Sequence, residues 1–327
     1  MIDSTVKTIA IFRALQLGDM LCAIPAIRSL RKAHPSVHIT LIGLPWAKEL
    51  IPRFPNYFDD FIAFPGYPGL PEQNFNQTLF DTFLKRVQAH QFDMVLQMQG
   101  NGTIVNQLLQ TFGARYVAGF SPTPQPLNPG LFFMPYPNHG HEINRHLELM
   151  AFLGIPSTGT DLEFPTTKQD EDDFHQLKLP VNNGRYIVIH PGSRGNWRQW
   201  PSLYFASLGD YCQKSGYQVV ITGTKDEIPI INEVIKLMKY PPIVAAGKTT
   251  IGSVAVLIDH AYALIANCTG VSHLASALAT QSVIISMDGE TERWAPLDKN
   301  LHATIDWTKT TDYHAVLKEV TALFFRL

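Results

Sequence analysis

The chain has 327 residues, of which 45% are hydrophobic, and a formal net charge of -2 at pH 7. This length is sufficient for two globular domains, each with its own buried core. A charge so close to zero gives no support for nucleic acid as the main partner. Cys22, Cys212 and Cys268 have neither zinc-site nor disulfide-framework spacing, which favours reduced thiols in the cytoplasm.

The N-terminal sequence, MIDSTVKTIAIF, lacks the basic-then-apolar order of a signal peptide. No apolar run approaches the roughly 20 residues that are needed to span a bilayer. We therefore expect a cytoplasmic protein. A peripheral contact of its loops with the inner membrane surface stays open.

The first half of the chain alternates predicted strands and helices. Residues 7–13 form a continuous apolar run, as is typical of a buried parallel strand. A helix follows the loop that ends in Leu17-Gly18-Asp19 and reaches about residue 33, and another is expected at residues 141–153. Further strands are predicted at residues 37–43, 58–64, 92–98 and 115–120.

A second series begins after a mixed, charged stretch at residues 155–182. Strands are predicted at residues 185–190, 217–223, 242–246 and 263–266, and helices at residues 201–215, 227–238, 253–261 and 271–279. This alternation predicts an α/β protein with parallel sheets and helices on both faces. We place two domains at residues 1–165 and 166–327, with a cleft that faces the carboxyl ends of the strands.

The loop at residues 267–270 is the most informative segment, because it joins a predicted strand directly to a predicted helix. Its backbone N–H groups and the positive end of the helix dipole would face a ligand above the strand. Gly270 allows close approach, Thr269 can donate a hydroxyl, and His273 lies about one turn further on. A pyrophosphate fits this chemistry. The alternative is an ordinary turn in which Thr269 or Ser272 caps the helix.

Two common nucleotide-binding motifs do not match. Residues 14–18, after the first strand, are not G-x-G-x-x-G, which argues against a nicotinamide dehydrogenase. Gly247-Lys248-Thr249 resembles the end of a P-loop, but Pro242 stands where that motif requires glycine. We therefore expect Lys248 and Thr249 to form a turn and cap before the next helix.

Three histidines near the end of the first half suggest a metal site at first sight. His139, His141 and His146 match no standard zinc spacing. A Pro/Asn/Gly loop followed by a helix explains them better, so we expect no metal there.

A set of landmarks runs through nearly the whole chain. These are Gly18-Asp19, Pro25-Ala26-Ile27, His190-Pro191-Gly192-Ser193, Trp200-Pro201, the turn at residues 223–227, Ala246-Gly247-Lys248-Thr249 and Thr269-Gly270-x-x-His273-Leu274-Ala275. In this order and spacing they resemble glycosyltransferase family 9, the heptosyltransferases of lipopolysaccharide core synthesis. The resemblance implies the GT-B fold, with two Rossmann-like domains across a deep cleft, and allows the last helix to pack back on the N-terminal domain.

The same resemblance implies an inverting, metal-independent glycosyltransferase that needs no cofactor. Its donor would be a nucleoside-diphosphate sugar, with ADP-heptose first, bound by the C-terminal domain. Its acceptor would be a lipopolysaccharide core-type glycan or glycolipid, bound by the N-terminal domain. The alternatives are a transferase with another nucleotide sugar, a non-catalytic nucleotide-sugar-binding protein and a nucleotide-sugar epimerase.

Asp19 matches the base that the family resemblance implies. The acceptor hydroxyl must lose a proton while the nucleoside diphosphate leaves. Gly18, on the acceptor side, removes side-chain bulk where the acceptor would approach. The alternative makes Asp19 a helix N-cap, for which aspartate is favoured, and the sequence leaves both open.

The resemblance places the donor contacts in the second half. Arg198, in Arg-Gln-Trp-Pro, stands where the family usually has lysine and can bind phosphate through two nitrogens. Ser193 and Arg194 follow a strand end and could reach the phosphates, and Glu227 matches a position that contacts the ribose. The rest of the set is Thr269, Gly270, Val271 and His273. The alternatives are a surface arginine and a solvated glutamate at a helix start.

Cys268 departs from the family pattern, which usually has aspartate before Thr-Gly. A carboxylate there could order the loop or contact the sugar, so the donor sugar stays open. Cys268 could be a reactive thiol, but a small buried filler is favoured. Residues 52–75 and 120–137 are rich in proline and aromatics, and could grip a glycan or lipid surface. The alternative is rigid connections whose aromatics pack on the core.

Overall fold

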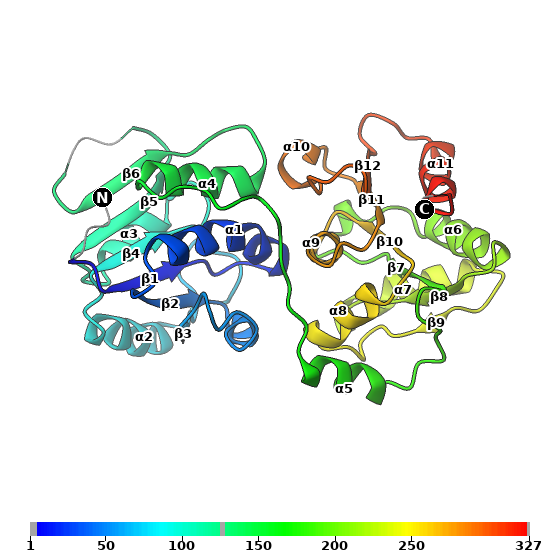
Figure 1. Cartoon of the computed structure of the whole chain (residues 1–327), viewed down its shortest axis with the longest axis horizontal. Helices are drawn as coiled ribbons and strands as arrows, with labels where there is room; N and C mark the ends of the chain where they lie inside the picture. Colours follow the sequence, from blue (N-terminus) through cyan, green and yellow to red (C-terminus); the bar gives the residue numbers. More distant parts are fainter. Residues whose placement is uncertain (1–4, 125–127, 326–327) are drawn as a thin grey trace. The chain divides into compact units, whose positions relative to one another are not determined.

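The computed structural model describes residues 5–124 and 128–325, and the chain divides into two compact units, Met1–Asp161 and Leu162–Leu327. In this described part, each unit holds a six-stranded parallel sheet with helices packed against it (Figure 1). Residues 1–4 of the N-terminal segment and residues 125–127 of the expected loop at 120–137 lie outside the described residues.

The strands of the first sheet lie in the order β3-β2-β1-β4-β5-β6. They are β1 Thr8–Phe12, β2 His38–Gly43, β3 Asp60–Ala63, β4 Met94–Gln97, β5 Tyr116–Ser121 and β6 Leu131–Pro135. The helices are α1 Leu17–Ala33, η1 Pro45–Leu50, α2 Gln77–Ala89, α3 Val105–Gln110 and α4 Glu142–Phe152. The strand order reverses between β1 and β4, and in open α/β sheets such a reversal is where ligands bind.

The second sheet has the order β12-β11-β10-β7-β8-β9, which repeats the first when counted from β7. Its strands are β7 Tyr186–His190, β8 Gln218–Ile221, β9 Ile243–Val244, β10 Ala263–Asn267, β11 Ser282–Ser286 and β12 His302–Asp306. Its helices are α5 Lys168–Gln176, η2 Asn196–Arg198, α6 Ser202–Lys214, η3 Lys225–Glu227, α7 Ile228–Leu237, α8 Ile251–Asp259, α9 Gly270–Ala277, α10 Thr291–Trp294 and α11 Tyr313–Leu323. Here the order reverses between β7 and β10.

The central strands are apolar because helices cover both of their faces. Every residue of β4, β7 and β10 is buried. Continuous burial is expected for parallel strands between two helical layers. The predicted α/β architecture is therefore confirmed.

Several segments differ from expectation. Residues 155–182 contain helix α5 as well as connecting chain, and β6 occupies part of the expected loop at residues 120–137. The cap before α8 is Thr250, whose hydroxyl accepts from Ser253 N–H, and not Thr249. Three buried side chains of α11, those of Val316, Val320 and Leu323, belong to the core of the second unit.

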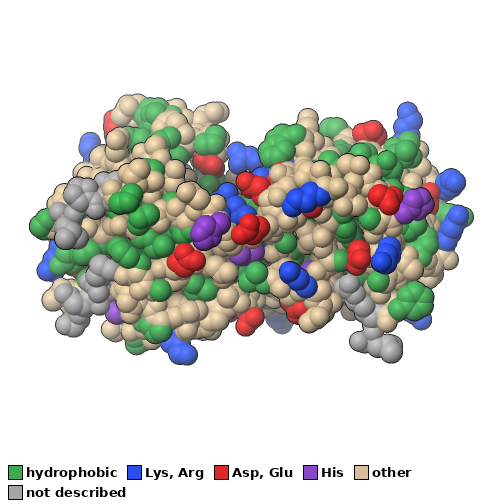
Figure 2. Space-filling view, turned by 90° about the horizontal axis from the view of Figure 1, so that it is seen from above, with side chains coloured by type: hydrophobic (Ala, Val, Ile, Leu, Met, Phe, Trp, Pro, Cys, Tyr) green, Lys and Arg blue, Asp and Glu red, His purple; other side chains and the backbone are tan. Residues whose placement is uncertain are grey.

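The aromatic residues of the segment at residues 52–75 differ in their exposure. Phe54, Phe58 and Phe64 of the segment at residues 52–75 are buried, so these aromatics pack on the core, whereas Phe75 is 39% exposed. On the face shown in Figure 2, hydrophobic side chains are interspersed with charged ones. Within residues 5–124 and 128–325, none of the helices combines the length and apolarity required to cross a membrane.

Helix α5 packs on α8 at Gly252. Asp170, the third residue of α5, forms a capping box with Thr167, in which its Oδ2 accepts the Thr167 N–H at 2.8 Å. A Cβ atom at position 252 would lie 1.5 Å from Asp170 Oδ1. Because Gly252 has no side chain, α5 and α8 can pack closely at this position.

Gly252→Ala should lower the free energy of unfolding by about 1–3 kcal/mol through this clash. A loss of stability would be informative, because alanine is intrinsically favoured over glycine in a helix by about 1 kcal/mol. In an Asp170→Ala background the remaining side-chain atom at position 170 is Cβ, 3.0 Å rather than 1.5 Å from the new methyl group, so the same substitution should cost clearly less. Urea unfolding measures both, and an equal loss in the two backgrounds would contradict this explanation.

Candidate functional site

Asp19 lies in the first turn of α1, just after β1. The N-cap of α1 is Gln16, so the N-cap interpretation of Asp19 is wrong. Its side chain is 27% exposed, and its Oδ1 lies 3.9 Å from Nη2 of Arg13. Arg13 Nε also donates to the Asp19 carbonyl at 2.8 Å. The guanidinium thus contacts both the backbone and the side chain of this turn. Gly18 beside it is buried.

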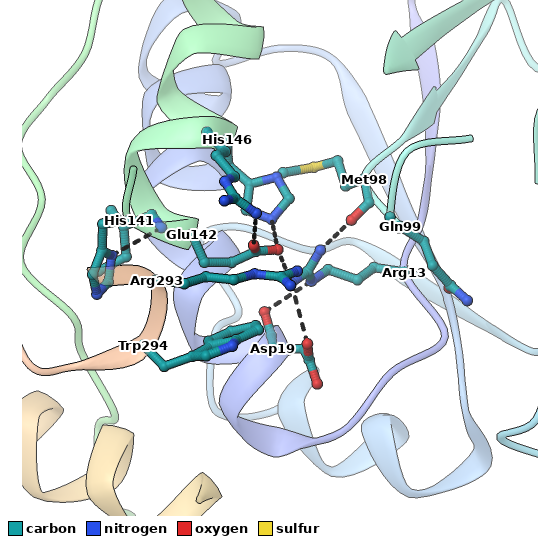
Figure 3. A network of polar contacts seen from close by, with 12 residues as sticks. Arg13, Asp19, Met98, Gln99, His141, Glu142, His146, Arg293 and Trp294 are labelled. Carbon is teal, nitrogen blue, oxygen red and sulfur yellow. Dashed lines mark hydrogen bonds and ion pairs between the residues drawn. The ribbon is translucent and has the colours of Figure 1, made fainter. Parts of the chain in front are cut away.

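A buried charge network that the sequence analysis missed supports this turn (Figure 3). Arg13, which directly follows β1, is fully buried and donates to the carbonyl of Met98, directly after β4. Glu142 Oε1 lies 3.4 Å from Arg13 Nη2 and 3.3 Å from His146 Nε2, while its Oε2 lies 3.5 Å from Arg145 Nη1. The available signals were an arginine that closes an apolar strand and the i, i+3, i+4 spacing on α4.

The histidines of this region have structural roles. His141 is the N-cap of α4, and its Nδ1 accepts the N–H of Ile143 at 3.2 Å. The His139 carbonyl accepts from Arg145 Nε, and His146 contacts Glu142. In the part of the chain that the structure describes, no group of three or more potential metal ligands occurs.

In the second unit, a buried amide joins the loops after β7 and β10. Asn267, the last residue of β10, is completely buried. Its Nδ2 donates to the carbonyls of Pro191 at 2.7 Å and Gly192 at 3.2 Å, and its Oδ1 accepts the Trp200 N–H at 3.0 Å. One side chain thereby fixes two adjacent loops at the reversal of the sheet.

Glu227 is not the solvated glutamate of the alternative interpretation. Its side chain is only 12% exposed, its Oε2 accepts the Thr224 N–H at 2.7 Å, and the same oxygen lies 3.7 Å from His190 Nε2. Burial lowers the pKa of His190, so the ring is neutral at pH 7 and the contact is not an ion pair. A Cβ on Gly192 would lie 2.2 Å from Glu227 Cδ, so this glycine lets the carboxylate sit beside the loop after β7.

Helix α9 begins directly after β10. Thr269 is its N-cap residue, yet across the described ranges no side chain caps this helix. The Ser272 hydroxyl instead donates to the Thr269 carbonyl at 2.7 Å, so neither residue acts as the expected cap. Backbone N–H groups at Gly270 and Val271 therefore stand at the positive end of the helix dipole. His273 is 4% exposed and contacts Trp294 edge to face.

The remaining donor candidates lie in the loop after β7. Ser193 is buried and Arg194 is exposed. Arg198 is not a free surface arginine, because its Nη2 lies 2.9 Å from Asp288 Oδ2. Cys268 is half-buried, and desolvation and the nearby Asp288 raise the pKa of its thiol to about 12. A raised pKa disfavours the thiolate, so the filler interpretation is favoured over a reactive thiol.

The predicted donor residues thus all follow strands β7, β8 and β10, which are neighbours in the sheet. Sequence reasoning missed Asn267, His190 and Asp288. A polar residue at the end of each apolar strand was the signal for the first two. Nothing in the sequence pointed from Asp288 to Arg198.

The chain is similar in sequence to proteins of a known family. The family model for glycosyltransferase family 9 (heptosyltransferase) matches residues 81–319. Lipopolysaccharide heptosyltransferase 3 of Escherichia coli (strain K12) is 26% identical over 304 residues, which are 87% of this chain and 83% of that relative.

Two solved structures share the fold. The glycosyl transferase family 9 structure from Veillonella parvula DSM 2008 has a TM-score of 0.80 and 19% identity, covering 98% of this chain and 97% of that one. The E. coli heptosyltransferase WaaC with ADP-2-deoxy-2-fluoro heptose has a TM-score of 0.70 and 17% identity, covering 96% and 99%. At these identities the likeness shows the fold, which is GT-B.

Asn267→Leu should destabilise the second unit by about 2–4 kcal/mol, since it leaves buried backbone groups without partners. The exposed Asn232→Leu on α7 is the matched control and should change the free energy of unfolding by less than about 0.5 kcal/mol. Chemical denaturation measures both. A loss at position 267 no larger than the control would show that this amide does not hold the loops.

Proposed function

Because the chain belongs to glycosyltransferase family 9, the heptosyltransferase family, we propose that it transfers heptose from ADP-heptose to a lipopolysaccharide core-type glycan. The observation that carries this proposal is the start of α9, which no side chain of the described residues caps and which follows β10, the neighbour of the strand whose loop carries Arg198. The E. coli relative is named a lipopolysaccharide heptosyltransferase, and the WaaC structure contains an ADP-heptose analogue. A glycolipid acceptor would bring this cytoplasmic enzyme to the inner membrane surface.

In this proposal the second unit holds the donor. The N–H groups at Gly270 and Val271 would bind the diphosphate, and Arg198 would add a positive charge. Ser193, Arg194 and His273 would supply further donors. The Glu227 carboxylate, already held by the Thr224 N–H, would accept hydrogen bonds from the ribose hydroxyls.

The first unit would hold the acceptor, with Asp19 as the base. The acceptor oxygen attacks the anomeric carbon on the face opposite to ADP, so the configuration inverts. Asp19 takes the hydroxyl proton as the new C–O bond forms, and the electrons of the broken bond leave with ADP. The charges at Arg198 and α9 stabilise the leaving diphosphate, so the reaction needs no metal ion.

A different nucleotide sugar is the second candidate donor. It is favoured by one observation, the half-buried thiol of Cys268 where the family usually has a carboxylate. A change at this position could alter the sugar while leaving the diphosphate contacts intact. A panel of nucleotide sugars in a transfer assay distinguishes the two.

ADP should stabilise the protein by about 2.7 kcal/mol at a hundredfold excess over its dissociation constant. Transfer from ADP-heptose should continue in excess EDTA, because the proposed positive charges come from the protein. Thermal shift and a product assay test the two statements. No shift with any nucleoside diphosphate at millimolar concentration would contradict the donor site. A loss of activity in EDTA that manganese or magnesium restores would contradict metal independence.

Asp19→Asn should lower turnover by about 10²- to 10⁴-fold, the usual contribution of a general base. Arg13 keeps Glu142 and the carbonyls of Asp19 and Met98 as partners, so the amide should lower the melting temperature only slightly. The affinity for ADP should also stay constant, since ADP is assigned to the second unit. A folded variant with near-full turnover would mean that another group is the base.

A further inference from the structure

Asp288 is a buried carboxylate whose two oxygens have separate tasks. It lies two residues after β11, and its side chain is 8% exposed. Its Oδ1 accepts from the Ser286 hydroxyl at 2.8 Å and from the Glu290 N–H at 3.2 Å, which fixes the carboxylate within its own loop. Its Oδ2 pairs with Arg198 Nη2 at 2.9 Å.

Arg198 is held from two directions. Its guanidinium carbon lies 4.7 Å from the centre of the Trp197 ring, while Asp288 binds one of its terminal nitrogens. Arginine has five N–H donors, so an ion pair at one nitrogen leaves donors for phosphate. Among the described residues, the buried Nε has no hydrogen-bond partner.

The Arg198–Asp288 ion pair joins the loops after two strands that flank a third. Arg198 follows β7 and Asp288 follows β11, and β10 lies between these two strands in the sheet. The loop after β10 carries Cys268, whose thiol is influenced by the charges of both residues. The ion pair therefore lies beside the start of α9, where the proposed diphosphate binds.

We propose that Asp288 is a positioning residue for donor binding: it holds the Arg198 guanidinium beside the start of α9, so that the remaining N–H donors are ordered before the diphosphate arrives. This inference rests on the proposed function, in which Arg198 binds the diphosphate. An unrestrained arginine loses much of its side-chain freedom on binding, whereas a guanidinium already held by a buried carboxylate loses less. The same carboxylate repels phosphate, so the experiment must show which effect is larger.

Isothermal titration with ADP at constant ionic strength tests the proposal. Arg198→Gln should weaken ADP binding about 10- to 100-fold, as expected for a charged hydrogen bond to phosphate. Asp288→Asn keeps Oδ1 for its own loop but replaces Oδ2 with an amide NH₂ that cannot accept from Arg198. It should weaken binding about 3- to 10-fold.

The double variant separates positioning from an independent role. If Asp288 acts through Arg198, Asp288→Asn adds no further loss in the Arg198→Gln background. A loss that multiplies in the double variant would overturn the proposal, as would unchanged or tighter ADP binding by Asp288→Asn alone. Glu171→Gln removes a partly exposed carboxylate that contacts His260 in the same unit, and it should leave ADP affinity unchanged.

Two further arms keep the outcomes distinct. If Asp288→Asn does not fold, Asp288→Glu keeps the charge but displaces the guanidinium by one methylene, and unchanged ADP affinity there would also overturn the proposal. If Arg198→Gln itself leaves ADP affinity unchanged, the proposed diphosphate contact of Arg198 fails. If Arg198→Gln weakens ADP binding and Asp288→Asn does not, the diphosphate contact of Arg198 stands and only the positioning role of Asp288 is refuted.

Discussion

The reversal of strand order in each sheet is the constraint on which both candidate regions depend. Crossover helices leave the sheet in opposite directions on either side of the reversal, so the loops there are not covered by a crossover. In the first unit these loops follow β1 and β4, and in the second they follow β7 and β10. In each unit a buried side chain joins the pair of loops.

The two units solve this problem with different chemistry. The first uses charge: Arg13 reaches from the end of β1 to the Met98 carbonyl after β4 and to Glu142 on α4. The second uses the neutral amide of Asn267. A buried charge is stable only while its partners remain, whereas a neutral amide avoids most of that penalty. The first unit thus holds its loops with ion pairs, and the second holds them with hydrogen bonds of a neutral side chain.

Much of the fold could be predicted because its signal is local. The apolar runs that became β1 and β7, and the amphipathic pattern of α4, are visible in short windows of sequence. The donor residues from Ser193 to His273 were likewise placed at strand ends, although their roles came from family resemblance. Helix α5 was missed because its nine residues, KQDEDDFHQ, bury only Asp170 and Phe174, and this leaves little hydrophobic period to detect.

The contacts that organise the site could not be predicted, since each joins residues far apart in the chain. Arg13 meets Glu142, and Arg198 meets Asp288, across intervals with no periodic pattern. Such pairs depend on strand order, which the sequence alone leaves unspecified. Cys268 shows the same limit, because its burial follows from groups on neighbouring loops.

The central claim is that the loops after β7 and β10 bind the donor diphosphate. A crystal structure of the full chain with ADP tests it most directly. We expect diphosphate oxygens within hydrogen-bond distance, about 2.7–3.2 Å, of the N–H groups at the start of α9 and of the Arg198 guanidinium. ADP bound at the loops after β1 and β4, or with its diphosphate away from α9, would contradict it.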